Sequence, residues 1–503
     1  MTNTPFSPPP GLTSDDTVFA APGRWGNGSL ARFYQGGWQI KGGWERLTLD
    51  NLGGVCRSVH TWTDTVSVLD IAFGLHNGLK VWQGSLLSDI APVGFVPGQI
   101  DGTGGAGVGT GAYGVGTYGT PSTVEFFPLT WSLDNWGGDL LANPRGRGIY
   151  QWEQDPLVRA IPLPGAPAKV TYMQVAPQRQ VFAFGCNEQV SGVFNDLCIR
   201  WSDIEDNTDW VPTSANNAGE WILESGGRIV CARFVGDYAY VWTSDGLFMG
   251  TFVGAPGQTW KFERVGMNCG AISPGAPVVR SQAVMWISPD RVFWTCALGG
   301  APQIVDCPIR QMFVDHIVAG QDDKIVGTST STFRELTWFW PDDRDGGFEP
   351  SRAVSFNPDG WSRDVLARSA YTDAGPQPFP VGVHPNGRVY WQEKGHSDDG
   401  APLTGYLEST DFYLGEAEGG VLVNGIWPDF RNQQGPMLLT IRTREFPQSP
   451  QRPHGPWSLS PGQAKRDFRL SGRIACIRYD WSSAPAFARG GKSELDVQRI
   501  GGR

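Results

Sequence analysis

One hairpin pattern recurs along most of this chain: a short apolar strand, a tight turn, and a second strand ending in aromatic residues. The clearest copies are Phe73–Trp82, Tyr240–Phe248, Trp286–Trp294 and Val383–Trp391, and weaker ones lie at 146–152, 195–201 and 338–342. The Asn-Gly and Asp-Gly pairs at several of these turns tolerate positive φ angles, so they predict type I′ turns between paired strands.

The spacing of these hairpins predicts the architecture. Their turns fall near positions 78, 147, 195, 246, 290, 343 and 387, at steps of about 69, 48, 51, 44, 53 and 44 residues. Blades of a β-propeller recur every roughly 40–50 residues, and a single four-stranded blade buries its faces only by stacking on others around an axis. We therefore predict an all-β protein whose main part is a propeller of six to eight blades, seven by hairpin count. A β-sandwich with irregular hairpins is the alternative.

Three segments differ in their spacing. Residues 1–45 are predicted to form an N-terminal arm and a first hairpin, 46–415 the propeller, and 416–503 a small C-terminal β module. A Gly-rich insertion near 101–119 accounts for the one long step. It contains two formal matches to the dinucleotide-binding fingerprint, but it lacks the required strand before and helix after, so we interpret it as a loop. A short helix is predicted from Pro308 to Ile317.

The charge is unevenly distributed. The chain has a net charge of −10, yet residues 431–503 carry 13 basic and 5 acidic side chains, a net of +8, which leaves −18 on the first 430 residues. An acidic body repels phosphates and is a poor general binder of nucleic acid. The arginine fork suits carboxylates at interfaces, so the basic residues of the C-terminal module are predicted to dock on an acidic partner surface; a solvated face is the alternative. The candidates are Arg442, Arg444, Lys465, Arg466, Arg469 and Arg473.

No motif in the sequence carries chemistry. There is no HExxH or Cys/His cluster, nucleophile elbow or P-loop lysine, so we predict no catalytic residue, metal or cofactor. The eight cysteines lack metal-ligand spacing and are expected to be buried, reduced thiols. The acidic run Asp203–Trp210 is interpreted as a turn anchored by its tryptophan. With no signal peptide and no apolar stretch of about 20 residues, the protein is expected to be made in a cytoplasm and to stay soluble or assemble there.

Several segments spread over most of the chain resemble one family, the tail nozzle or hub (packaged-DNA stabilisation) proteins of short-tailed bacteriophages. They are Arg24-Trp25, Leu30–Phe33, Gly36–Trp44, Thr130–Gly137, Arg200–Trp210, Met267–Gly270, Tyr406–Phe412 and Trp427–Phe430. None is a catalytic signature, and each reads as a turn or a blade anchor.

The resemblance implies a structural virion protein of the tail, made in the host cytoplasm. The resemblance further implies a homohexameric ring that closes and conducts the DNA exit channel below the portal and the head-to-tail adaptor. The implied partners are other copies of the chain, the adaptor, tail fibres or spikes, and genomic DNA passing without specific binding. The alternatives are a carbohydrate-binding or glycan-hydrolysing propeller of a phage tail, and a cellular scaffold propeller.

Overall fold

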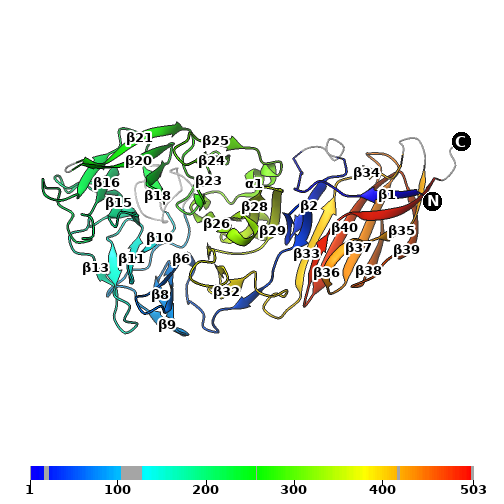
Figure 1. The fold of residues 1–503 in the computed structure, drawn as a ribbon, viewed down its shortest axis with the longest axis horizontal. Helices are drawn as coiled ribbons and strands as arrows, with labels where there is room; N and C mark the ends of the chain where they lie inside the picture. Colours follow the sequence, from blue (N-terminus) through cyan, green and yellow to red (C-terminus); the bar gives the residue numbers. More distant parts are fainter. Residues whose placement is uncertain (1, 16–21, 103–126, 256–257, 416–419, 500–503) are drawn as a thin grey trace, which may run out of the picture.

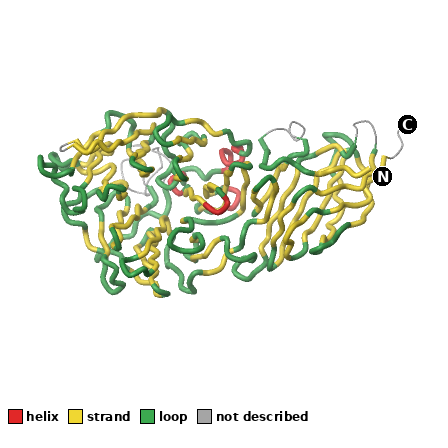
Figure 2. The backbone as a smooth tube through the Cα atoms, viewed as in Figure 1, coloured by secondary structure: helices red, strands yellow, loops and turns green. Residues whose placement is uncertain are grey.

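The computed structural model describes residues 2–15, 22–102, 127–255, 258–415 and 420–499, and these residues are almost entirely β (Figure 1). Strands and connecting loops make up nearly all of the described residues, with short helical segments near the middle of the molecule (Figure 2). The predicted Gly-rich insertion near 101–119 lies outside the described residues except for Asp101 and Gly102.

Seven four-stranded antiparallel sheets follow one another along the described part of the chain, which confirms the predicted propeller. Blades 1 to 4 are built of consecutive strands: β6 (Cys56–Thr63), β7 (Leu69–Leu75), β8 (Gly78–Gln83) and β9 (Leu86–Asp89); β10 (Trp131–Trp136), β11 (Asp139–Pro144), β12 (Tyr150–Trp152) and β13 (Ile161–Pro162); β14 (Val170–Val175), β15 (Val181–Asn187), β16 (Phe194–Trp201) and β17 (Gly219–Ile222); β18 (Ile229–Val235), β19 (Tyr238–Thr243), β20 (Gly246–Ala255) and β21 (Gln258–Met267). Blades 5 to 7 comprise β22 (Val278–Arg280), β23 (Ala283–Ile287), β24 (Phe293–Ala297) and β25 (Gln303–Val305); β26 (Val326–Thr330), β27 (Glu335–Pro341), β28 (Pro350–Asn357) and β29 (Gly360–Val365); and β30 (Ala370–Thr372), β31 (Val381–Val383), β32 (Val389–Gln392) and β5 (Trp44–Arg46).

The last blade takes its fourth strand from the start of the chain. β5 pairs with β32, so residues more than 300 positions apart complete one sheet. The first strand of blade 1, β6, contacts the first strands of both blade 2 and blade 7, β10 and β30, which closes the ring around an axis. The seven blades follow from the strand pairing, and together they form the larger part of the molecule (Figure 1).

Each repeated hairpin corresponds to the second and third strands of a blade. The turn near 78 joins β7 to β8, the turn near 246 joins β19 to β20, and the turn near 387 joins β31 to β32. The predicted type I′ geometry is wrong at all three turns, since Asn77, Gly78, Asp245, Gly246 and Asn386 lack a positive φ and only Gly387 has one. At the first turn the register also differs from the prediction. Leu75 pairs with Gly78, so the turn residues are His76 and Asn77, one position earlier than predicted.

Aromatic and branched side chains fill the spaces between neighbouring blades. Separate apolar clusters join blades 1 and 2, 2 and 3, 3 and 4, and 4 and 5. Another cluster packs Phe73 of blade 1 against Val381 of blade 7 and so buries the point of closure. The largest cluster is continuous from blades 5 and 6 into the second part of the molecule.

That second part is a β module of three further sheets beside the propeller (Figure 1). In order of pairing, the sheets are β1 (Thr2–Phe6), β42 (Ser493–Arg499), β35 (Val421–Trp427) and β39 (Arg466–Gly472); β2 (Trp25–Ser29), β33 (Leu403–Ser409), β40 (Ile474–Ser483), β37 (Met437–Arg444) and β38 (Arg452–Leu459), with β34 (Phe412–Tyr413) also on β40; and β3 (Ala31–Tyr34), β4 (Gly37–Ile40), β41 (Phe487–Gly490) and β36 (Phe430–Gln434).

The predicted boundaries at 45 and 416 require correction. Residues 2–40 are not a separate arm, because β1, β2 and β4 pair with strands of the C-terminal module and β3 pairs with β4. The module also begins earlier than predicted, at β33, which pairs with β2 and β40. The chain therefore starts in the module, closes the propeller with β5, follows the seven blades and returns to the module.

The helical segments and the thiols agree with the sequence interpretation. The predicted helix is α1 (Arg310–His316), whose buried Phe313 packs against Phe293 of blade 5 and Trp340 of blade 6. Three 3-10 turns accompany it: η1 (Asp322–Lys324), η2 (Ser331–Phe333) and η3 (Asp343–Asp345). All eight cysteines are buried and free, and burial raises the pKa of Cys56 and Cys231 to about 12.

Candidate assembly interface and the charged junction

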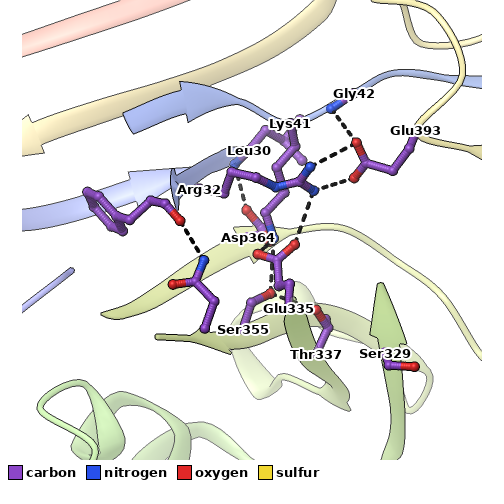
Figure 3. A network of polar contacts seen from close by, with 12 residues as sticks. Leu30, Arg32, Lys41, Gly42, Ser329, Glu335, Thr337, Ser355, Asp364 and Glu393 are labelled. Atoms are coloured by element: carbon purple, nitrogen blue, oxygen red, sulfur yellow. Dashed lines mark hydrogen bonds and ion pairs between the residues drawn. The ribbon is translucent and has the colours of Figure 1, made fainter. Parts of the chain in front are cut away.

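A buried network of charges joins the module to the propeller (Figure 3). Arg32 on β3 and Lys41, directly after β4, extend from the module toward Glu335 on β27, Asp364 on β29 and Glu393 beyond β32. Arg32 Nη2 lies 3.1 Å from Glu335 Oε2, and its Nη1 donates to Glu393 Oε2 at 3.0 Å. Lys41 Nζ lies 2.9 Å from Glu335 Oε1 and 2.7 Å from Asp364 Oδ2. Two strands of one unit are thus bound to two blades of the other.

Burial makes these contacts strong and mutually dependent. The side chains of Arg32, Glu335 and Asp364 are 1%, 2% and 1% exposed. Burial alone would raise the pKa of Glu335, but Arg32 and Lys41 hold it below its usual value. Burial raises the pKa of Asp364 despite the nearby Lys41. Removal of any one member would leave a buried charge without compensation, which is costly, so the network fixes the module on the propeller.

The charged residues of this network form no recognisable pattern in the sequence. The one local sign of the junction is the pair Gly42 and Gly43. A Cβ on Gly43 would lie 2.2 Å from the carbonyl oxygen of Ser397, and one on Gly42 would lie 2.5 Å from Glu393 Oε2. Only glycine allows this backbone to approach the segment after β32 so closely. The Gly-Gly pair was therefore a detectable signal of a close contact, but not of which residues it contacts.

The six basic residues predicted for an interface lie in one region of the module. Their positions are Arg442 and Arg444 on β37, Lys465 directly before β39, Arg466 and Arg469 on β39, and Arg473 directly after it. The six residues thus lie on or beside two strands of the module, but they differ in whether a carboxylate of the same chain pairs with them.

Three of the six pair with carboxylates of the same chain. Arg442 Nη1 lies 2.8 Å from Glu408 Oε1, Arg444 binds the buried Asp411, and Lys465 Nζ lies 2.9 Å from Asp467 Oδ1. Glu408 and Asp411 belong to 403–430, a segment with five carboxylates that lies within the acidic first 430 residues. With this segment and 2–40, which has two charges of each sign, the net charge of the module is +3 rather than +8.

Arg466 and Arg469 differ from these three. Within the described residues neither forms an ion pair, and Arg469 is exposed. Both lie on β39, one of the two edge strands of its sheet, and the ring of Phe468 between them stacks on Trp457 of β38 at 4.2 Å. β38 is also an edge strand, but Pro453 and Pro456 lie on it, and proline prevents strand addition. β39, with its charged edge, is the better candidate for contact with a partner.

The propeller axis contains a small polar cavity of about 230 Å³, lined by the first strands of the blades. Arg233 on β18 donates to the hydroxyl of Tyr172 on β14 and to the carbonyl oxygen of Pro274 at 3.0 Å. At Lys324, the ammonium lies 2.5 Å from Asp101 and 2.9 Å from Glu349. The cations here face carboxylates or carbonyl groups, so the cavity is an internally neutralised structural centre.

Asp203–Trp210 is a hydrogen-bonded turn, as predicted. The buried indole of Trp210 donates to the carbonyl oxygen of Asn207 at 2.8 Å. Asp203 Oδ1 accepts from the backbone of Asn217 at 2.7 Å, and hydrogen bonds from Thr208 hold the pKa of Asp206 below its usual value. Among the described residues, no group of three His, Cys, Asp or Glu side chains is placed to hold a metal ion. No helix of the described residues is both long and apolar enough to cross a membrane.

Comparison with known proteins identifies no family. No family model matches the chain, and no curated protein does. Similar solved structures include the computationally designed Ika8 protein, at 15% identity over 70% of this chain and all of that chain, with a TM-score of 0.37. BBS1N, crystallised in complex with ARL6DN, is 12% identical over 70% of this chain and 97% of that chain, with a TM-score of 0.40. PorZ, a surface component of the type-IX secretion system of Porphyromonas gingivalis, is 8% identical over 75% of this chain and 44% of that chain, with a TM-score of 0.38. The fold assignment therefore depends on the strand pairing.

Proposed function

We propose that the protein is a structural subunit of a short-tailed bacteriophage tail, a nozzle or hub that assembles into a ring around the DNA exit channel. The observation that carries the proposal is the buried charge network of Arg32, Lys41, Glu335, Asp364 and Glu393. It makes the propeller and module one rigid block that presents a charged sheet edge. A rigid block of this kind suits a load-bearing assembly. The segments that resemble the tail family lie in both units, so the resemblance covers the junction as well.

The size of the axial cavity limits where DNA could pass. The major groove of a double helix is alone about 12 Å wide, and a cavity of about 230 Å³ does not admit a duplex. A conduit for DNA would therefore have to lie between copies of the chain, which requires a ring. The acidic character of the first 430 residues, net −18, would allow DNA to slide, since each neutralised phosphate adds affinity through counterion release.

We propose β39 as the assembly contact, with Arg466 and Arg469 docking on an acidic surface of a neighbouring copy or of the adaptor. Charge complementarity of this kind acts mainly on the rate of encounter and on register. Salt would therefore slow assembly more than it would weaken a completed ring. The tail of the virion would be its location, with tail fibres or spikes as further partners.

An enzymatic role is not favoured by the geometry at the axis. A glycan-hydrolysing propeller would need two carboxylates poised across one open pocket, whereas Glu349 and Asp323 are bound to Arg57 and Arg145. The proposal therefore includes no catalytic residue, metal or cofactor.

A charge reversal tests the assembly role. In native mass spectrometry the wild-type chain should form a closed ring, which we expect to be a hexamer. Arg466→Glu with Arg469→Glu should remain monomeric, with the stability of the monomer nearly unchanged. The matched control is Arg179→Glu with Lys261→Glu, the same change of charge at exposed positions of the propeller, and it should assemble normally. Assembly of the β39 variant at the wild-type rate would refute the interface, and a wild-type chain that stays monomeric at all concentrations would refute the ring.

A further inference from the structure

A second cavity, of about 380 Å³, lies where the module meets blades 6 and 7. Its walls come mainly from the segment between β29 and β30, the turn between β31 and β32, and the start of β33. Leu30, Trp44 on β5 and Asp398 complete them. Asn386 and Arg388 at its rim are exposed, whereas Arg368 in its wall is 2% exposed. The volume is within the roughly 300–1,000 Å³ range of small-molecule sites.

Arg368 is a buried cation that forms no ion pair among the described residues, although the charge of Asp398 acts on it from beyond ion-pair distance. Its guanidinium donates to the carbonyl oxygen of Ala367 at 2.6 Å and to Gln392 Oε1 at 3.2 Å, and its Nε has no partner among the described residues. The guanidinium carbon lies 4.9 Å from the ring of Trp44 and 5.2 Å from that of Tyr390, both of which also line the cavity. Burial lowers the pKa of Arg368 to about 10, so the group is still charged at neutral pH.

The contrast with the neighbouring junction is informative. Arg32 and Lys41, which are also buried, each face two carboxylates. A buried charge is normally paired, because desolvation without compensation is costly. The one carboxylate in the cavity wall, Asp398, already accepts the indole N–H of Trp44 at 2.5 Å. The guanidinium of Arg368 therefore has unused capacity to bind an anion.

The remaining polar groups of the wall favour a ligand with a single negative charge. His384 Nδ1 accepts the backbone N–H of Asn386 at 3.1 Å, so the neutral ring carries its proton on Nε2 and can donate there. Burial and the nearby Arg368 lower the pKa of His384, which keeps the ring neutral at pH 7. Arg368 and Arg388 against Asp398 leave a net charge of +1. One carboxylate balances this charge, whereas a doubly charged phosphate would exceed it.

We propose that this cavity is a binding site for a small organic carboxylate, whose anionic group pairs with the guanidinium of Arg368. Arg388 attracts the anion at the rim, and Trp44 and Tyr390 flank the paired groups and shield them from water. Ion pairs in such partly dry surroundings are stronger than at the surface. The site is independent of the assembly role, and it requires no second copy of the chain.

Isothermal titration of the full chain with benzoate tests the proposal, with benzamide as the uncharged control and ionic strength held constant. Benzoate should bind saturably at one site, and benzamide should not bind. Arg368→Met should weaken benzoate binding by about tenfold or more, the loss expected for one charge-assisted hydrogen bond. Arg388→Gln, at an exposed position, should weaken it by a smaller factor, and Arg469→Met, in the module, should leave it unchanged.

A crystallographic experiment keeps the test independent of how the variants fold. Crystals of the wild-type protein soaked in 4-bromobenzoate should show the anomalous bromine signal in this cavity, with the carboxylate beside Arg368. The proposal would be overturned if benzamide bound as tightly as benzoate, or if inorganic phosphate bound more tightly than benzoate. It would also be overturned if Arg368→Met kept the wild-type affinity for benzoate, or if bromine were located only outside this cavity.

Discussion

Replacement of Lys41 by methionine should weaken the junction between the module and the propeller and so destabilise the folded protein. Methionine keeps much of the apolar stem but removes the ammonium that lies 2.9 Å from Glu335 and 2.7 Å from Asp364. Both carboxylates are at most 2% exposed. Breaking a buried ion pair by removing one partner costs about 3–5 kcal/mol, because the other charge remains buried. We expect Lys41→Met to lower the free energy of unfolding by this amount.

A second substitution distinguishes lost charge balance from lost packing. Asp364→Asn removes the carboxylate that becomes uncompensated when Lys41 is replaced. The backbone N–H of Leu30 donates to Asp364 at 2.7 Å in the wild type, and the amide oxygen of an asparagine can still accept this hydrogen bond. The double variant Lys41→Met/Asp364→Asn should therefore recover about 1–3 kcal/mol of the loss, a coupling typical of residues in one network. The deficit of the single variant should also shrink at acid pH. Burial raises the pKa of Asp364 in the folded protein, so protonation favours the folded state and relieves the uncompensated charge.

The assay is equilibrium urea denaturation followed by tryptophan fluorescence. Lys394→Met is the matched control, since Lys394 pairs with Glu45 at 2.8 Å but the two side chains are 36% and 47% exposed. An exposed pair contributes only about 0–1 kcal/mol, so this variant should unfold like the wild type. A loss below about 1 kcal/mol for Lys41→Met, or a double variant no more stable than the single one, would refute the reasoning.

Two further predictions concern the fold. Burial raises the pKa of Asp70 on β7 from 3.8 to about 6, so the folded protein binds this proton more tightly and loses stability as the pH rises from 3.8 through 6. Asp70→Asn should therefore gain stability relative to the wild type, from almost nothing near pH 4 to about 1–3 kcal/mol at pH 8. A pH-independent difference in urea denaturation would contradict this. A fragment of residues 416–503 should fail to fold, because it lacks β1 to β4 and β33, whereas residues 403–503 co-expressed with 1–43 should give a soluble complex; well-dispersed NMR spectra from 416–503 alone would show the module boundary to be wrong.

The propeller could be predicted because its signal is local. Each hairpin lies within about ten residues of sequence, and turn residues such as Asn386-Gly387 and Pro289-Asp290 mark the junction of the second and third strands in a blade. The repeat therefore gave the number of blades correctly. The exact turn geometry was not predictable in this way, because strand register moved the turn at Asn77 by one residue.

The module and its junction could not be predicted because their contacts join distant parts of the chain. β1 pairs with β42, and Lys41 contacts Asp364. One sequence contains no record of such pairs, so residues 1–45 looked like an arm. For the same reason Arg442 and Arg444 looked unpaired, although Glu408 and Asp411 bind them.

The most direct test of the proposed role is electron microscopy of the assembled protein, with the structure fitted into the averaged map. The account predicts a ring of identical copies, with β39 of each copy at a contact and an opening between the copies wide enough for a DNA duplex. Monomeric particles, or a ring in which β39 faces solvent and no such opening exists, would contradict it.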